Sequence, residues 1–227
     1  MTAALVGSSV TGYDGSSSTS VATSAKSTTN GNSLLVGVVA QEGLGVAVID
    51  SCTDTAGNTF TALTQYGAGG GGAIARWFYC HNITGHGSNV CTAGFDVANR
   101  YKHIIQIEVS GLKNQAPIDE DGVVPLSATV ATASVAMGST VGPVFAIGTS
   151  TNDRTWTPGA SFTELADWGT SAAAEVYTGL NATGTVSTDM TASGASNLVL
   201  AAVGFEEAAV ASVLGVFMHH YRQQGIA

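Results

Sequence analysis

Residues 103–109 read HIIQIEV, and this stretch alternates apolar and polar side chains with a period of two. The apolar residues at 105, 107 and 109 share one face of a strand, and the two polar residues between them share the other. Two further stretches, residues 34–40 (LLVGVVA) and 198–203 (LVLAAV), are apolar without interruption. Such runs predict central strands that are covered on both faces.

Similar short runs recur along the whole chain at intervals of about a dozen residues, separated by Gly, Ser, Asn and Asp clusters. This spacing is typical of a sandwich or a barrel. We therefore predict an all-β fold, an antiparallel, jelly-roll-like β-sandwich that forms one domain over residues 1–205. The expected strands are 3–11, 19–27, 33–41, 46–52, 59–66, 73–81, 89–96, 103–110, 127–137, 144–148, 162–168, 174–177 and 197–205.

The C-terminal tail, residues 206–227, departs from the strand pattern. Glu206 and Glu207 stand where a helix N-terminus would favour acids, and an almost continuously apolar stretch follows them. An apolar tail outside a finished sandwich has to be covered, either by its own domain or by a partner or symmetry mate. The residues expected to make a partner contact are Val213, Leu214, Val216, Phe217, Met218 and Tyr221.

Charge excludes several classes of partner. The chain has 7 Lys and Arg against 16 Asp and Glu, a formal net charge of −9, and only 10% of its residues are charged. A nucleic-acid binder needs clustered cations, so neither nucleic acid nor an anionic membrane surface is an expected partner. The N-terminus has no signal-peptide pattern, and no run of 18 apolar residues occurs. We expect synthesis in a host cytoplasm followed by release on a particle.

A search for catalytic patterns finds no G-x-S-x-G, no phosphate-binding loop and no H-E-x-x-H. We therefore expect no enzyme activity, no cofactor, no catalytic residue and no metal site. A calcium site formed by Asp50, Asp54 and Asn58 is an alternative to a plain turn at those residues. The acids at 119–121 precede a glycine and are interpreted as a solvated turn, with cation binding as the alternative.

Three cysteines cannot all pair within one chain. If residues 81–90 form a symmetric hairpin, Cys80 and Cys91 lie opposite each other at a distance compatible with a bridge. A cytoplasmic origin favours free thiols. The sequence leaves both states open.

Two tryptophans, Trp156 and Trp168, fall in or beside loops of the second half. One interpretation is that these two side chains pack in the core or at its rim. The alternative is that they form a platform on which sugar rings stack.

Three motifs in order carry a family resemblance: residues 54–61 (DTAGNTFT), 77–83 (WFYCHNI) and 107–112 (IEVSGL). They resemble a family of jelly-roll-like β-sandwich modules of uncharacterised bacterial exported proteins and phage virion proteins, with the pattern D-x-A-G-N-x-[YF]-T, Y-Y-x-x-N-I and E-Y-S-G-L. The resemblance covers residues 3–205, and Val109 replaces the aromatic residue of the third motif. It implies the sandwich fold and no assigned catalytic residue.

These observations lead to a functional hypothesis. We predict a virion structural protein of a bacteriophage, a capsid decoration or cement protein that stabilises the particle by burying surface. Its partners would be the major capsid protein or neighbouring virion subunits, with a homotrimer as the favoured oligomer. The alternative is a carbohydrate-recognition or receptor-binding module on a virion or bacterial surface.

Overall fold

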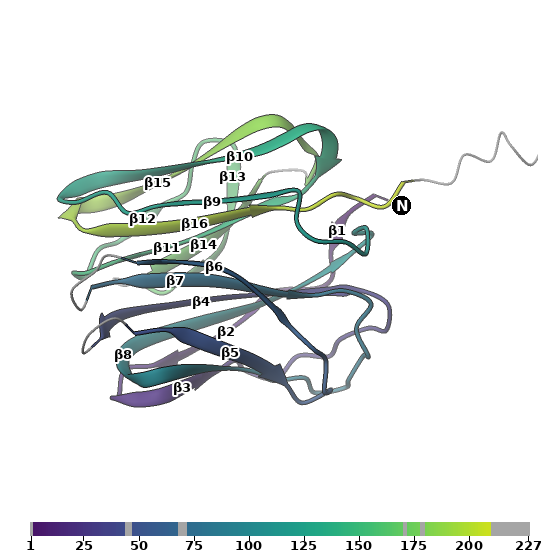
Figure 1. Cartoon of the computed structure of the whole chain (residues 1–227), viewed down its shortest axis with the longest axis horizontal. Helices are drawn as coiled ribbons and strands as arrows, with labels where there is room; N and C mark the ends of the chain where they lie inside the picture. The colour runs from purple at the N-terminus through teal and green to yellow at the C-terminus, as the bar shows by residue number, and fades with distance from the viewer. Residues whose placement is uncertain (1, 44–46, 68–71, 170–171, 178–179, 210–227) are drawn as a thin grey trace, which may run out of the picture.

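The computed structural model describes residues 2–43, 47–67, 72–169, 172–177 and 180–209. These residues form antiparallel strands in stacked layers (Figure 1), which confirms the predicted β-sandwich class. The strands are β1 (Ala4–Leu5), β2 (Val10–Asp14), β3 (Ser18–Ala22), β4 (Ser33–Gly43), β5 (Ile49–Asp54), β6 (Thr61–Gly67), β7 (Ile74–Cys80), β8 (Cys91–Ser110), β9 (Asp119–Val123), β10 (Ala128–Gly142), β11 (Val144–Ser150), β12 (Trp156–Thr157), β13 (Phe162–Asp167), β14 (Ala172–Tyr177), β15 (Ala182–Ser196) and β16 (Leu198–Gly204).

The first half of the chain forms two layers that share the 20-residue strand β8. Up to about Asn99 this strand pairs with β3 and β5 in an outer sheet. Beyond that point it pairs with β4 on one side and β2 and β1 on the other, in an inner sheet that β7 and β6 complete. Tyr101 has a positive φ of 49° just after the change of partners.

The second half repeats this arrangement. Its inner sheet has the order β13-β14-β11-β16-β9, which matches β6-β7-β4-β8-β2 strand for strand. Its outer sheet, β10-β15-β12, matches β3-β8-β5, and the successive strands β15 and β16 take the place of the single β8. The chain therefore contains two copies of one jelly-roll-like sandwich, here called repeat 1 (residues 2–112) and repeat 2 (residues 113–209). The span that was expected to form one sandwich holds both.

The repeat is also visible in the amino-acid sequence, where two stretches share one pattern. Residues 60–67 (FTALTQYG) and 162–169 (FTELADWG) share an F-T-x-L-x-x-aromatic-G pattern and form the equivalent strands β6 and β13. The aromatic residue of each copy packs against the other repeat. Tyr66 lies over Gly122 of β9, where an added Cβ would come within 2.4 Å of its ring, and Trp168 lies against His103 of β8.

The two inner sheets pack face to face, and the core between them is here called the seam. The strand β4 lies on β11 and β7 lies on β16. In Figure 1 the two sheets meet at about mid-height. At the centre, an added Cβ on Gly37 would come within 2.9 Å of Ile147, so the glycine allows the sheets to approach closely. The buried apolar side chains of the seam include Leu35, Val39, Trp77, Ile105, Ile107, Val109, Phe145, Ile147, Val176, Val199, Val203 and Phe205.

The apolar runs at 34–40 and 198–203 are central strands, as predicted. The strand β4 lies between β7 and β8, and β16 lies between β11 and β9. Leu35 and Val39 face the seam, whereas Val36 and Val38 face the core inside repeat 1. All seven residues of β16 are buried. Both faces of these strands are therefore covered by apolar side chains.

Several expectations about strands need correction. Residues 3–11 do not form one strand, since β1 ends at Leu5 and β2 begins at Val10. The acids at 119–121 lie on strand β9 and not in a turn. Residues 182–196, which were not predicted as a strand, form β15. The two strands expected at 89–96 and 103–110 are one continuous strand, β8.

The start of the C-terminal tail, residues 206–209, contains no helix, so no helix begins at Glu206. Glu207 forms an isolated bridge with Leu112, and its carboxylate accepts a hydrogen bond from the Ala3 N–H (3.2 Å). Glu206 accepts a hydrogen bond from the Lys113 N–H. The tail therefore first runs along the connection between the repeats. The six residues predicted for partner contact, Val213 to Tyr221, lie outside the described residues.

Candidate functional site

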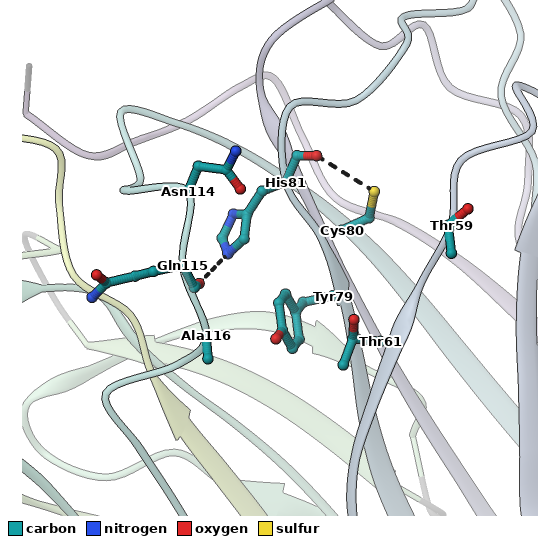
Figure 2. A pocket seen from close by; sticks show the side chains of 8 residues that line it. All are labelled: Thr59, Thr61, Tyr79, Cys80, His81, Asn114, Gln115 and Ala116. Carbon is teal, nitrogen blue, oxygen red and sulfur yellow. Dashed lines mark hydrogen bonds between the residues drawn. The ribbon is translucent and has the colours of Figure 1, made fainter.

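A polar pocket of about 270 Å³ opens beside the connection between the two repeats. Strand β6 and the residues before it form one wall, the end of β7 forms the floor, and the connecting residues 114–116 form the other wall (Figure 2). We call it the connection pocket. Its lining residues are Thr59, Thr61, Tyr79, Cys80, His81, Asn114, Gln115 and Ala116.

His81 is fixed by two hydrogen bonds. Its Nε2 lies 2.7 Å from the carbonyl oxygen of Gln115, and its Nδ1 lies 2.7 Å from the Ser33 hydroxyl. Because a carbonyl oxygen can only accept, Nε2 carries the proton and Nδ1 accepts from Ser33. Burial lowers the pKa of His81, although the hydrogen bond to Gln115 opposes this effect. The ring is therefore a neutral structural element that ties repeat 1 to the connection.

Tyr79 contributes the aromatic surface of the pocket. Its ring meets His81 at 5.2 Å and packs edge-on against Phe205 at 5.7 Å between ring centroids. In the strand register Tyr79 lies opposite Thr61. These neighbours hold the phenol ring in one orientation, and Figure 2 shows it between Thr61 and the connecting residues.

The connection itself is held by Glu206 at the start of the tail. The Glu206 carboxylate accepts hydrogen bonds from the side chains of Gln115 (2.6 Å) and Lys113 (2.9 Å). These bonds lower the pKa of Glu206, with Lys113 as the largest cause. Since Glu206 and Lys113 neutralise each other outside the pocket, the lining residues present no net charge.

The two tryptophans proposed as a sugar platform lie in different cores. Trp156 is 5% exposed and packs inside repeat 2 beside Met190, so it offers no ring face to solvent. Trp168 is half-buried at the edge of the seam. The structure therefore does not combine the two rings into one platform.

His103 lies between two aromatic rings. Its ring stacks on Tyr13 at 4.7 Å and lies 5.2 Å from Trp168. Both of its ring nitrogens lack a hydrogen-bond partner, and burial lowers its pKa to about 4. A neutral imidazole thus serves as a flat packing element between the repeats, a role that the alternating pattern of residues 103–109 does not indicate.

The cysteines do not have the expected geometry. Cys80, on β7, is in register with Leu34, whereas Cys91, at the start of β8, is in register with Asp54 of β5. They are therefore not cross-strand partners in a hairpin, and all three cysteines are free thiols. Burial is the largest cause of the raised pKa of each thiol.

Of the three residues considered for calcium binding, Asp54 and Asn58 form a braced turn, whereas Asp50 lies on β5 and accepts a hydrogen bond from the Ser51 hydroxyl. The Asp54 carboxylate accepts hydrogen bonds from the Asn58 N–H (2.8 Å), the Asn58 side chain (2.7 Å) and the Asn89 side chain (2.9 Å). Gly57 has a positive φ of 78° at this turn. Among the described residues, no group of three or more His, Cys, Asp or Glu side chains could hold a metal ion.

The acids of β9 bond to backbone groups of neighbouring strands. Asp119 accepts a hydrogen bond from the Ala136 N–H and Asp121 accepts one from the Ser134 N–H, both at 2.7 Å. Glu120 points to repeat 1 and accepts from the N–H and hydroxyl of Thr64. Asp119 and Asp121 therefore cover N–H groups on the outer edge of β10, which would otherwise be open to pairing with another chain.

We expect the double substitution Asp119→Ala with Asp121→Ala to expose this edge. Two hydrogen bonds of roughly 1 kcal/mol each are lost, so the melting temperature should fall by several degrees. Light scattering should also show more self-association, because the freed N–H groups of β10 can pair between molecules. The exposed Asp153, which makes no such bond with its side chain, gives the control Asp153→Ala. Unchanged melting and scattering in the double variant would contradict the edge-covering role.

Comparisons with known proteins identify no relative. No family model and no curated protein matches the chain. Among solved structures, YhaK from Escherichia coli is 10% identical over 88% of each chain, with a TM-score of 0.27. Quercetin 2,3-dioxygenase from Acinetobacter baumannii is 10% identical over 98% of this chain and 77% of its own, with a TM-score of 0.24. Salicylate 1,2-dioxygenase from Pseudoaminobacter salicylatoxidans is 6% identical over 82% and 71%, with a TM-score of 0.21.

These similarities are too weak to support an inference about activity. In the part of the chain that the structure describes, no helix is long and apolar enough to cross a membrane.

Proposed function

We propose that the chain is a non-enzymatic virion structural protein of a bacteriophage, a decoration or cement protein that stabilises the particle. The observation that carries this proposal is the use of the cationic side chains. Four of them donate to backbone carbonyls, most of which lie on other strands or turns. These side chains therefore hold the fold together and do not gather in one site. These are Lys26 on Val6 and Ser8, Arg76 on Ile49 and Leu63, Lys102 on Ser16 and Asn99, and Arg154 on Gly194 and Ala195.

The outer face of the sheet β10-β15-β12 supports the same proposal. Along β15 every second side chain is buried, and the side chains between them are mostly exposed. The exposed side chains on this face are almost uncharged and mostly carry hydroxyl groups, with Val130 and Ala136 as apolar members: Val130, Thr132, Ser134, Ala136, Thr157, Thr183, Thr185, Ser187, Asp189, Thr191 and Ser193. A surface that carries mainly hydroxyl groups can pack against a neighbouring subunit without the free-energy cost of removing charged side chains from water.

The assembly that we propose is a trimer bound to the major capsid protein or to neighbouring virion subunits, made in the host cytoplasm. The C-terminal tail from Val213 to Tyr221 is the proposed contact. Stabilisation would come from surface burial.

Mass spectrometry of purified virions tests this proposal. Virions from a lysate that produces the chain should contain it in a fixed ratio to the major capsid protein. Particles that lack it should lose their genome at a lower temperature, and adding back the full-length chain should restore the stability. A version truncated after Ala209 should restore it less well. Absence of the chain from every virion fraction would refute the proposal.

Carbohydrate recognition is the second candidate function. The burial of Trp156 removes the platform first suggested for it, and the connection pocket is the observation that now favours it.

A further inference from the structure

We propose that the connection pocket binds one neutral pyranose ring, as a free sugar or as the terminal residue of a glycan. This inference deepens the second candidate function and does not depend on the virion proposal. It rests on the size of the pocket, its lack of charge, one held aromatic ring and a set of unpartnered polar groups around that ring.

Size limits the occupant to a small molecule. Sites for drug-sized ligands range from roughly 300 to 1,000 Å³, and the connection pocket measures about 270 Å³. A single six-membered sugar ring is of the right order, whereas a folded peptide segment or a nucleotide is too large. Additional sugars of a longer glycan would extend into solvent through the open side.

Charge further restricts the ligand class. The lining residues include no Lys, Arg, Asp or Glu, and His81 is held as a neutral imidazole. A phosphate or carboxylate would find no cation to pair with, and a metal ion would find no carboxylate ligand. A charged ligand would lose its hydration in this pocket without gaining a partner of opposite charge, whereas a neutral ligand would not. The lining therefore favours a neutral ligand.

The polar groups are of the kind that recognise sugar hydroxyls. The hydroxyls of Thr59, Thr61 and Tyr79 and the side-chain amide of Asn114 have no hydrogen-bond partner among the described residues. Hydroxyl and amide groups both donate and accept, as sugar hydroxyls do. Four such groups around one pocket can satisfy several hydroxyls of a single ring.

Tyr79 adds an apolar surface to these polar groups. Sugar rings carry C–H groups on one face, and an aromatic side chain packs against such a face while its phenol hydroxyl bonds nearby. Because His81 and Phe205 fix the Tyr79 ring, little conformational freedom is lost when a ligand binds. The equivalent register position in repeat 2 pairs Thr163 with Val176, so it lacks the aromatic residue.

The test uses the full-length chain and a panel of methyl hexopyranosides. Saturation-transfer NMR and calorimetry should detect at least one neutral pyranoside and should show weaker or no binding of its uronic acid and amino-sugar counterparts. The variants Thr61→Val and Asn114→Ala should each weaken binding by about tenfold, equal to ~1.4 kcal/mol. Thr163→Val, the matched position in repeat 2, should bind as the unsubstituted chain does.

Three outcomes would overturn the inference. One is the absence of binding by every neutral pyranoside while the chain remains folded by circular dichroism. Another is stronger binding of a charged sugar than of the neutral one. The third is binding that Thr61→Val and Asn114→Ala leave unchanged, which would place the sugar elsewhere on the surface. Since virion content is measured separately, failure here is distinguishable from failure of the virion proposal.

Discussion

Replacing Trp77 with alanine should destabilise the chain by about 3–5 kcal/mol, the usual result of removing a buried tryptophan. Trp77 is 2% exposed and belongs to repeat 1, yet its indole N–H donates to the Ala201 carbonyl of repeat 2 at 3.0 Å. Its ring also lies 6.3 Å from that of Phe145 in repeat 2. The substitution therefore removes apolar contacts across the seam and leaves a buried carbonyl with one bond fewer.

Denaturant unfolding, followed by circular dichroism, measures this loss. Trp77→Phe keeps most of the ring volume and removes the hydrogen bond, so it should cost less than Trp77→Ala. Leu126→Ala removes an apolar side chain that is 69% exposed and serves as the surface control. If Trp77→Ala and Leu126→Ala have equal unfolding midpoints, the seam is not the tightly packed core described above.

A second readout separates the repeats. Each repeat has its own internal core, and the seam joins them. Weakening the seam should therefore broaden the unfolding transition or split it into two, because the two sandwiches lose the contacts that make them unfold together. A single sharp transition at a lower midpoint would mean that the two repeats remain one cooperative unit without Trp77.

The sequence predicts the central strands of the two inner sheets well because their signal is local. The unbroken apolar runs of β4 and β16 require cover on both faces, and the alternation of residues 105, 107 and 109 places them in the seam. Neither inference needs knowledge of distant parts of the chain.

The missed strands have patterns that resemble loops. Strand β15 consists largely of Thr, Ser, Gly and Ala, and Val186 and Met190 are the only large apolar residues on its buried face. Strand β9 is acidic and lies between prolines, which favours the interpretation as a turn. In both cases pairing with a partner strand overrides weak local propensity.

The prediction that Cys80 and Cys91 lie opposite each other in a hairpin was wrong for a related reason. Consecutive strands are neighbours in most sheets, but here β7 belongs to the inner sheet and β8 begins in the outer one. The connection pocket could not be predicted either, since it depends on the approach of Gln115 to His81 across the connection. The repeat itself does have a local signal, because residues 60–67 and 162–169 share one pattern.

The second large effect concerns Glu175, a fully buried carboxyl in repeat 2. Its Oε2 accepts a hydrogen bond from the Gly159 N–H at 3.0 Å, and its Oε1 has no partner. Burial raises the pKa of Glu175 to about 8; the bond from Gly159 opposes this effect and the charge of Asp189 adds to it. At neutral pH the folded chain therefore holds a proton on Glu175 that the unfolded chain releases.

The sign of the pH dependence follows from this difference. Below the unfolded pKa of 4.5 both states are protonated and the contribution to stability is complete. As the pH rises toward 8 only the folded state keeps the proton, so stability falls by up to about 1.4 kcal/mol per pH unit, or roughly 3–5 kcal/mol in total. Above pH 8 the folded chain contains a buried carboxylate, and this contribution no longer changes.

Glu175→Gln should remove this dependence, because the amide is uncharged at every pH and its carbonyl can still accept the Gly159 N–H. At pH 8.5 we expect the variant to be several kcal/mol more stable than the unsubstituted chain, whereas at pH 5 the two should differ little. The control is Glu164→Gln, an exposed residue in register with Glu175 on β13. The quantity to compare is the difference in unfolding free energy between variant and parent at each pH. His103 and the cysteines titrate in both proteins, so their contributions cancel in this difference. Parallel pH profiles for the Glu175 variant and the parent would show that this carboxyl is already ionised in the folded chain at neutral pH.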